Sequence, residues 1–469
     1  MPGILPQSET LNSFPAPWPE DLLPGIQNTL EAKSRKVWIL DDDPTGTQTI
    51  AGLPVITSWG VDTLRAEFDQ PEIACFVLTN SRGLTAERSS ELHRAFVRNL
   101  REAAGDRHFT LISRSDSTLR GHYPLETNVL AEAIGGADIT LIAPYFAAGG
   151  RFTCNDTHYV AEQGQLIPAG DTPFARDAVF GYRNSHLPSW VEEKTNGATK
   201  ADNVVCLPLE TIRNHGPNAI ARLLIQIPSG SVVIVNAIDQ SDIEVVTTAV
   251  LAVEAVGYTI VARTAASYVC ARVGQRPPPL LTGEQISDNQ GQGGLTIVGS
   301  HVPKTTAQLN QVKLQHNVDC IELNVADLLD GKTRDAAVAT AIAATNAALA
   351  RGGDTVVHTS RKLIRSSDDT TNLSISSEVS RALIEVVQNL AQRPRYLIAK
   401  GGITSSDTAT EGLGVKRAIV QGQILPGVPV WTLGPETKFP GLSYVIFPGN
   451  VGDDNAVAEA ISKFNTTSK

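Results

Sequence analysis

The feature that most constrains the fold is a short, β-rich apolar run that recurs along the chain, followed by a turn and a longer stretch with helical periodicity. This alternation is typical of βαβ units, because parallel strands need crossover connections and helices that cover the sheet faces. The sequence therefore predicts an α/β protein with parallel-rich sheets covered by helices, two of them over 85–104 and 335–350. The predicted strands span 36–41, 73–78, 109–113, 139–143, 231–236, 258–263, 295–299, 319–323, 355–359, 395–399 and 444–447.

A change of composition past the middle of the chain predicts a boundary between two domains. The 469 residues exceed the usual size of one domain, and residues 276–294 combine three prolines with a polar, glycine-rich stretch. Such a stretch favours neither helix nor strand, so we expect a linker over 281–294 between domains at 36–280 and 295–469. The proline-rich residues 1–35 are predicted to form an extension outside the first sheet.

The composition and charge of the chain exclude several classes of protein. Hydrophobic residues make up 42% of the chain and charged residues 19%, which suits a large core and not a disordered protein. A formal charge of −10 offers no general attraction to nucleic acid or to an anionic membrane. The prolines of the N-terminus interrupt every apolar run, unlike a secretory signal, and no run reaches the length of a membrane span. We therefore expect a cytoplasmic protein that binds neither nucleic acid nor membrane.

An acidic cluster follows the first predicted strand, where Asp41, Asp42 and Asp43 come directly after the letters KVWIL. In open α/β sheets, ligands bind outside the carboxyl ends of the strands, so these carboxylates are placed to hold a hydroxyl, a metal ion or a proton. The alternative is a solvated turn in which Pro44 and Gly46 only set the backbone geometry. The position at a strand end favours a functional cluster.

A second polar cluster runs from Ser113 to His122 after another predicted strand, with Arg114 and Arg120 on either side of Asp116. Arginine binds a carboxylate through two parallel hydrogen bonds, while serine, threonine and aspartate satisfy hydroxyl groups. The alternative is a helix N-cap with the arginines in solvent. The density of polar groups favours a site for an anionic polyol, and a sugar acid fits this chemistry.

Three glycine-containing turns follow predicted strands in the second half of the chain, at 299–300, 401–405 and 449–452. Glycine lets a backbone approach phosphate closely, and a helix N-terminus supplies amide donors, so three such turns in one sheet suggest a nucleotide site. Neither the Walker phosphate-loop pattern nor GxGxxG is present, which leaves ordinary tight turns as the alternative.

These motifs, in this order, resemble those of the four-carbon acid sugar kinase family from about residue 36 to the C-terminus. Its DDxTG motif is similar to residues 42–46, its DSTLRG motif to residues 116–121, and its P-x(4)-GR segment to the region 144–151. Its Gly-Ser turn, GGxTS and SGNxG motifs resemble the three turns of the second half. Arg114 stands where many members have lysine and His122 where many have asparagine, and both departures concern the identity of the substrate.

The resemblance implies an ATP-dependent kinase that phosphorylates the terminal hydroxyl of a four-carbon sugar acid such as threonate, erythronate or 3-oxo-tetronate. It implies that 36–280 binds the sugar acid and that 295–469 binds ATP, expected with Mg²⁺, with the active site in the cleft between them. No metal ligands are assigned, and a homo-oligomeric state stays open.

Roles for individual residues follow from the motifs and their chemistry. We expect Asp43 to act as the catalytic base or to orient it, and Asp42 to position substrate or Mg²⁺. The predicted substrate-binding residues are Arg114, Asp116, Ser117, Arg120, Arg151 and His158, with the carboxylate on Arg120 and Arg114. The predicted nucleotide-binding residues are Ser300, Gly401, Gly402, Ile403, Thr404 and Gly449.

Two other classes of protein share part of these patterns. A haloacid-dehalogenase-type phosphatase would use DxDxT with Asp41 as nucleophile and Asp43 as acid, but its acidic partner motif at 452–454 lies about 410 residues away, past the predicted boundary. A two-domain sugar-binding sensor would normally carry a signal peptide or a DNA-binding module, and neither is evident in this sequence. The sequence therefore favours the kinase.

Overall fold

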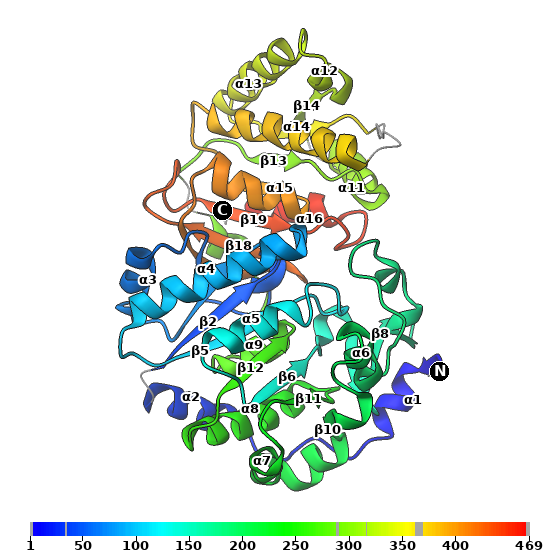
Figure 1. Cartoon of the computed structure of the whole chain (residues 1–469). Helices are drawn as coiled ribbons and strands as arrows, with labels where there is room; N and C mark the ends of the chain where they lie inside the picture. The colour runs from blue at the N-terminus through cyan, green and yellow to red at the C-terminus, as the bar shows by residue number, and fades with distance from the viewer. Residues whose placement is uncertain (1–2, 33–34, 288–289, 316, 362–368, 466–469) are drawn as a thin grey trace. The chain divides into compact units, whose positions relative to one another are not determined.

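The computed structural model describes residues 3–32, 35–287, 290–315, 317–361 and 369–465, which group into two compact units (Figure 1). Unit 1 comprises Met1–Thr49 and Ser58–Pro277, and unit 2 comprises Ile50–Thr57 and Pro278–Lys469. The short segment Ile50–Thr57 therefore belongs to unit 2, although the residues before and after it in the sequence belong to unit 1. No helix of the described residues combines the length and the apolar character that crossing a membrane demands.

Unit 1 contains a sheet of parallel strands whose residues are almost all buried. Continuous apolar runs such as VWIL suit this position, because helices cover both faces of a parallel sheet. In sheet order the strands are β10 (Val205–Leu207), β11 (Ser231–Val235), β6 (Ile139–Ala143), β12 (Ile260–Thr264), β5 (Phe109–Arg114), β2 (Lys36–Asp41) and β4 (Ala74–Leu78). Its longer helices are α2 (Leu23–Ala32), α3 (Val61–Phe68), α4 (Ala86–Ala104), α5 (Leu125–Ala133), α6 (Leu187–Lys194), α7 (Leu209–Gln226), α8 (Gln240–Ala255) and α9 (Ala266–Arg272).

A small antiparallel sheet in unit 1 ties the N-terminal extension to the rest of the unit. Its strands, in order, are β1 (Leu5–Pro6), β9 (Gln165–Pro168), β8 (Thr157–Glu162) and β7 (Arg151–Cys154), and the short helix α1 (Gln7–Asn12) follows β1. The described part of residues 1–35 lies outside the large sheet. It is nevertheless packed, since Arg213 donates to the Pro15 carbonyl at 2.7 Å and the Trp18 ring lies against Gly216.

Unit 2 has a mixed sheet that joins an antiparallel half to a parallel half. The antiparallel strands are β3 (Pro54–Ile56), β17 (Arg417–Leu425), β18 (Val428–Leu433) and β19 (Ser443–Phe447), and the parallel strands continue with β16 (Leu397–Lys400), β13 (Leu295–Val298), β15 (Asp354–Thr359) and β14 (Val318–Leu323). The helices are α10 (Gly283–Ile286), α11 (Pro303–Gln315), α12 (Val325–Leu329), α13 (Arg334–Ala350), α14 (Asp369–Gln388), α15 (Gly402–Asp407) and α16 (Ala456–Asn465).

The eleven strands predicted from the sequence are confirmed, each with ends within two residues of the expected ones, as are the helices α4 and α13. The expectation that residues 276–294 hold neither helix nor strand is wrong for the part that the structure describes, which leaves out 288–289. The one-turn helix α10 forms there because Thr282 and Gln285 make reciprocal capping bonds. Leu281 and Ile286 join the apolar core of unit 2.

The fold predicts that Gly216→Ala destabilises the protein strongly. Gly216 interrupts α7 with a φ of 66° and a ψ of −168°, a conformation that disfavours side chains, and an added Cβ would lie 2.4 Å from the Trp18 ring. We expect a loss of about 3 kcal/mol in the free energy of unfolding, from backbone strain and overpacking together. Urea unfolding of full-length variants measures it.

Gly230→Ala is the matched control, because Gly230 also has a positive φ, of 86°, but has no atom within 4 Å of an added Cβ. Its loss should be about 1 kcal/mol. In a Trp18→Ala background, Gly216→Ala should lower the free energy of unfolding by less, because the clash with the ring is gone. Equal losses for the two glycine variants would contradict the packing of Trp18 against α7.

Candidate active site

The register of the large sheet in unit 1 places Asp41 directly across from Arg114, at the carboxyl ends of β2 and β5. Arg114 Nη1 donates to Asp41 Oδ1 at 3.1 Å, and both side chains are buried. An added Cβ on Gly46 would lie 2.0 Å from Asp41 Oδ2, so only glycine fits against this carboxylate. Burial raises the pKa of Asp41 to about 7, although Arg114 opposes the rise.

Asp42 is a buried carboxylate whose hydrogen-bonding capacity is unused. Neither of its side-chain oxygens accepts a hydrogen bond from the described residues. Its nearest cations are Arg114, with Nη1 at 3.6 Å, and Arg82, with Nε at 4.0 Å. Burial raises the pKa of Asp42 to about 6 against the pull of these two guanidiniums.

Asp43 is held by many donors instead. It caps the short 3₁₀ helix Pro44–Thr47, and its Oδ1 accepts from the Thr45 amide at 2.9 Å and from the Thr45 hydroxyl at 2.6 Å. Its Oδ2 pairs with Arg82. Burial opposes the ionisation of Asp43, but Arg82 and Thr45 outweigh it and hold the pKa below its usual value.

Arg82 joins the two polar clusters, and the sequence analysis missed it. It lies in the turn Ser81–Gly83 that follows β4, the strand next to β2. Its Nη1 lies 3.3 Å from Asp116 Oδ1, and the same guanidinium pairs with Asp43. Arg82 follows the predicted strand 73–78. A position soon after a strand was also the feature that indicated the cluster Asp41, Asp42 and Asp43.

The loop after β5 carries Asp116 and Arg120, which pair with each other at 2.8 Å between Oδ2 and Nε. Arg120 Nη1 also lies 3.7 Å from Asp177 Oδ2. Arg82 and Arg120 outweigh the effect of burial and hold the pKa of Asp116 well below its usual range. The loop also contains Leu119 with a φ of 70°, a value that is rare outside glycine.

Two buried residues contact backbone carbonyls of this loop and hold it in place. His158 Nε2 lies 2.7 Å from the Ser117 carbonyl and Nδ1 lies 2.9 Å from the Thr153 hydroxyl, and burial lowers the pKa of His158 to about 4. Because both ring nitrogens are engaged, the structure places this predicted substrate-binding residue in the support of the loop. Arg263 Nη2 donates to the Arg120 carbonyl at 2.9 Å. The sequence analysis missed Arg263, although a charged residue inside the apolar run TIVART was its signal.

Arg151 has a guanidinium that includes an unpartnered nitrogen. It begins β7 and lies 5.3 Å from the centroid of the Phe174 ring, as Arg120 also does. Its buried Nε has no hydrogen-bond partner in the described part of the chain. Burial lowers the pKa of Arg151. Partly buried donors without acceptors beside Arg120 can bind an incoming anion.

In unit 2, the three predicted turns meet at the carboxyl ends of the neighbouring parallel strands β13, β16 and β19. Gly401 has a φ of 121°, and an added Cβ would lie 3.2 Å from the Ser300 Cβ. An added Cβ on Gly449 would lie 3.2 Å from the Ser300 hydroxyl, and one on Gly299 would lie 2.2 Å from the Thr404 hydroxyl. The structure thus brings these predicted residues together.

Two further residues of this cluster bear on a ligand. Gly402 opens α15, and the apolar side chain of Ile403 next to it is 69% exposed. Arg361, which the sequence analysis missed, donates from Nη2 to the Ser300 carbonyl at 2.8 Å. Its buried Nη1 has no hydrogen-bond partner among the described residues. Arg361 follows the predicted strand 355–359, and this position was the available signal.

The structure contains no ready-made metal centre in the ranges that it describes, since no three or more histidine, cysteine, aspartate or glutamate side chains group to bind an ion. The donors near the turns of unit 2 include hydroxyls, the guanidinium of Arg361 and the ammonium of Lys400. Close-approaching glycines and an open guanidinium fit a phosphate group.

Comparison with known families agrees with this division of chemistry. Residues 37–272 match the model of a sugar-binding N-terminal domain, and residues 295–457 match the model of a nucleotide-binding C-terminal domain. The two matches define the class as a two-domain α/β protein with a sugar-binding and a nucleotide-binding domain. The chain belongs to the four-carbon acid sugar kinase family.

Individual relatives support the same family and fold. A D-threonate kinase from Bordetella bronchiseptica is 28% identical over 217 residues, which are 44% of this chain and 48% of that relative. The match thus spans about half the length of this curated relative. Haemophilus influenzae protein HI1011 shares the fold with a TM-score of 0.62 at 16% identity, over 91% of this chain and all of the other. A Salmonella typhimurium LT2 protein does so with a TM-score of 0.67 at 17% identity, over 92% of this chain and 99% of the other.

The site predicts different stability costs for two of its arginines. Arg114→Met leaves the buried carboxylates of Asp41 and Asp42 without their shared cation, so we expect a loss of about 3–5 kcal/mol in the free energy of unfolding. Arg120→Met removes a partly exposed pair and should cost about 1 kcal/mol or less. Urea unfolding at pH 8 compares the two variants. A larger loss for Arg120→Met would contradict the internal role of Arg114.

Proposed function

We propose that the protein transfers the γ-phosphoryl group of ATP to the terminal hydroxyl of a four-carbon sugar acid such as threonate, erythronate or 3-oxo-tetronate. The family and the similarity to a D-threonate kinase support this activity. The observation that carries the substrate class is the open guanidinium of Arg151 beside the paired Arg120 and Asp116, which together offer cationic donors and a hydroxyl acceptor.

In this proposal, Arg151 and Arg120 hold the carboxylate of the sugar acid. The Arg151 Nε has no partner in the described residues, and Arg120 can exchange its weak contact with Asp177 for a bidentate contact with the substrate. Arg114 neutralises Asp41 and Asp42 and does not reach out to the ligand. Asp116 and Ser117 accept and donate to the sugar hydroxyls.

The phosphates of ATP are proposed to bind the turns of unit 2. Ser300, Gly401 and Gly449 supply close backbone approach, Thr404 a hydroxyl, and Arg361 an open guanidinium nitrogen. The exposed side chain of Ile403 offers an apolar surface to the nucleotide base. Mg²⁺ bound with ATP would neutralise the phosphate charge that develops during transfer.

We assign the acceptance of the hydroxyl proton to Asp42. The sequence analysis expected Asp43 in this role, and Asp43 is the more exposed of the two, at 21% against 2%. The contacts favour Asp42, because Thr45 and Arg82 engage Asp43 and hold its pKa down. Asp42 has unused oxygens and a pKa of about 6, which suits a base near neutral pH.

The phosphatase alternative has no support from the comparisons or from the contacts. Its nucleophile would be Asp41, which is 0% exposed and bonded to Arg114. Its acidic partner motif at 452–454 lies in unit 2, whereas Asp41 lies in unit 1. An in-line attack by Asp41 on a phosphate ester is therefore not supported.

The proposed activity predicts ADP release only when ATP and a suitable sugar acid are both present. A coupled ADP assay screens D- and L-threonate, D- and L-erythronate and their 3-oxo derivatives. For the substrate that turns over, Arg151→Met should raise the KM at least tenfold, because a charged contact with the carboxylate is lost, and should leave the KM for ATP within twofold.

Arg183→Met is the control, because Arg183 is 90% exposed and its only described charge partner is Glu193 at 3.8 Å. This variant should behave as wild type. Failure of every sugar acid to stimulate ADP release would defeat the proposed function. An equal rise of both KM values in Arg151→Met would instead remove Arg151 from the sugar-acid site.

The assignment of the base predicts a split between two neighbouring isosteric variants. Asp42→Asn should lower kcat by roughly 10²- to 10⁴-fold, as is typical of a lost general base, while Asp43→Asn should lower it less. The carboxylate must be ionised to accept a proton, so kcat/KM of the wild type should rise with pH through about 6. This acid limb should disappear in Asp42→Asn and persist in Asp43→Asn. The reverse pattern would return the role to Asp43.

A further inference from the structure

Lys400 binds the turn that follows a neighbouring strand, although it was not among the residues predicted for the nucleotide site. It is the last residue of β16, directly before Gly401, and its side chain is fully buried. Its Nζ donates to the Pro448 carbonyl at 2.6 Å and to the Gly449 carbonyl at 3.2 Å. The ammonium also lies 4.1 Å from the centroid of Phe447, the residue across from it in the register of β16 and β19.

This ammonium has no counter-charge from the protein. No carboxylate of the described residues forms an ion pair with it, and the charged group that acts on it is a second cation, Lys304. Burial and, in addition, Lys304 lower the pKa of Lys400 to about 7. An unpaired buried cation is unfavourable in the empty protein, so an anion bound nearby would stabilise it.

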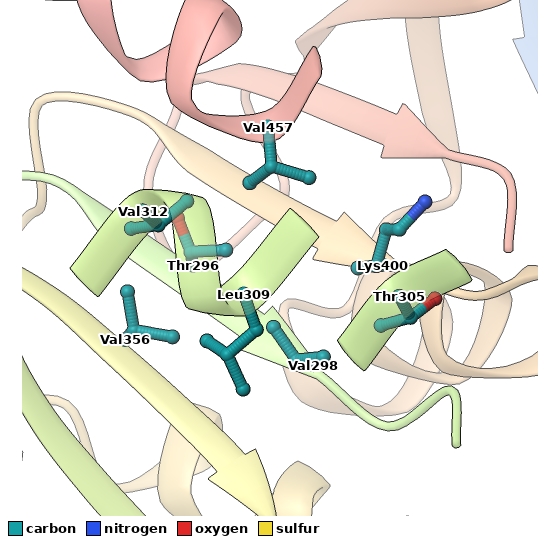
Figure 2. A pocket seen from close by; sticks show the side chains of 8 residues that line it. All are labelled: Thr296, Val298, Thr305, Leu309, Val312, Val356, Lys400 and Val457. Atoms are coloured by element: carbon teal, nitrogen blue, oxygen red, sulfur yellow. The ribbon is translucent and has the colours of Figure 1, made fainter. Parts of the chain in front are cut away.

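Thr305 extends the connection from Lys400 to the third turn. Its hydroxyl can donate either to the Gly449 carbonyl at 3.2 Å or to the Ser300 hydroxyl at 3.1 Å. Figure 2 shows Lys400 and Thr305 on the wall of a small cavity whose remaining lining is mostly apolar. The apolar lining comprises Val298, Leu309, Val312, Val356 and Val457, with Thr296.

We propose that Lys400 is the positioning residue of the nucleotide site. It holds the Gly449 turn in place for the phosphates, and the bound phosphates supply the counter-charge to its ammonium that the protein does not provide. The inference rests on the proposed nucleotide-binding role of unit 2. Because the ammonium is buried, Lys400 acts through the turn and through its electric field rather than by touching the ligand.

The test measures the affinity of the full-length protein for ATP by calorimetry and for adenosine by ligand-observed NMR. Lys400→Met removes the ammonium and keeps an unbranched apolar stem against the cavity. We expect ATP affinity to fall at least tenfold and adenosine affinity to change less than twofold, because adenosine has no phosphate. Thr305→Val should weaken ATP binding severalfold by removing a donor to the Gly449 carbonyl.

Lys438→Met is the matched control, because the Lys438 Nζ also donates to a carbonyl, that of Gln388 at 2.6 Å, and lies over a phenylalanine ring, Phe439. It should bind ATP as wild type does. A folded Lys400→Met variant with unchanged ATP affinity, or with equal losses for ATP and adenosine, would overturn the proposal and leave the proposed function standing. Absence of ATP binding in the wild type would overturn both.

Discussion

Backbone hydrogen bonds between neighbouring parallel strands fix which residues lie side by side at the strand ends. This register determines where the charged side chains of both units lie. In unit 1 it sets Asp41 across from Arg114, and in unit 2 it sets Lys400 across from Phe447. Because backbone hydrogen bonds fix the strands of a buried sheet, the backbone positions of these pairs cannot shift past each other without breaking the sheet. The turns that follow therefore begin at fixed positions, from which their polar groups converge.

The electrostatics of unit 1 follow from how many charges this register brings together. Four carboxylates (Asp41, Asp42, Asp43 and Asp116) share three guanidiniums (Arg82, Arg114 and Arg120). The most exposed carboxylates receive most of the donors, and the two most buried ones have raised pKa values. Arg151 adds a further guanidinium that Asp116 and Arg120 influence, and its buried Nε has no hydrogen-bond partner in the described residues.

The sequence predicted what depends on local pattern and missed what depends on strand order. Continuous apolar runs between helices identified the parallel strands. The hairpin β17–β18 escaped notice because Gly422 and Pro429 interrupt its apolar pattern and no helix separates its strands. Arg82 could not be joined to Asp43 and Asp116 without knowing that β4 lies next to β2. Likewise, residue type alone could not rank Asp42 against Asp43, because the difference comes from Thr45 and from burial.

The membership of β3 in unit 2 has a consequence for how the chain is made. Its partner β17 lies about 360 residues further along the chain. At a synthesis rate of roughly 5–20 residues per second, the ribosome needs on the order of 20–70 s to supply that partner. Unit 1 can therefore assemble around residues 58–277 at a time when the segment 50–57 has been synthesised but its partner strand β17 has not. Completion of unit 2 must therefore bring in a strand that was synthesised about 360 residues before its partner.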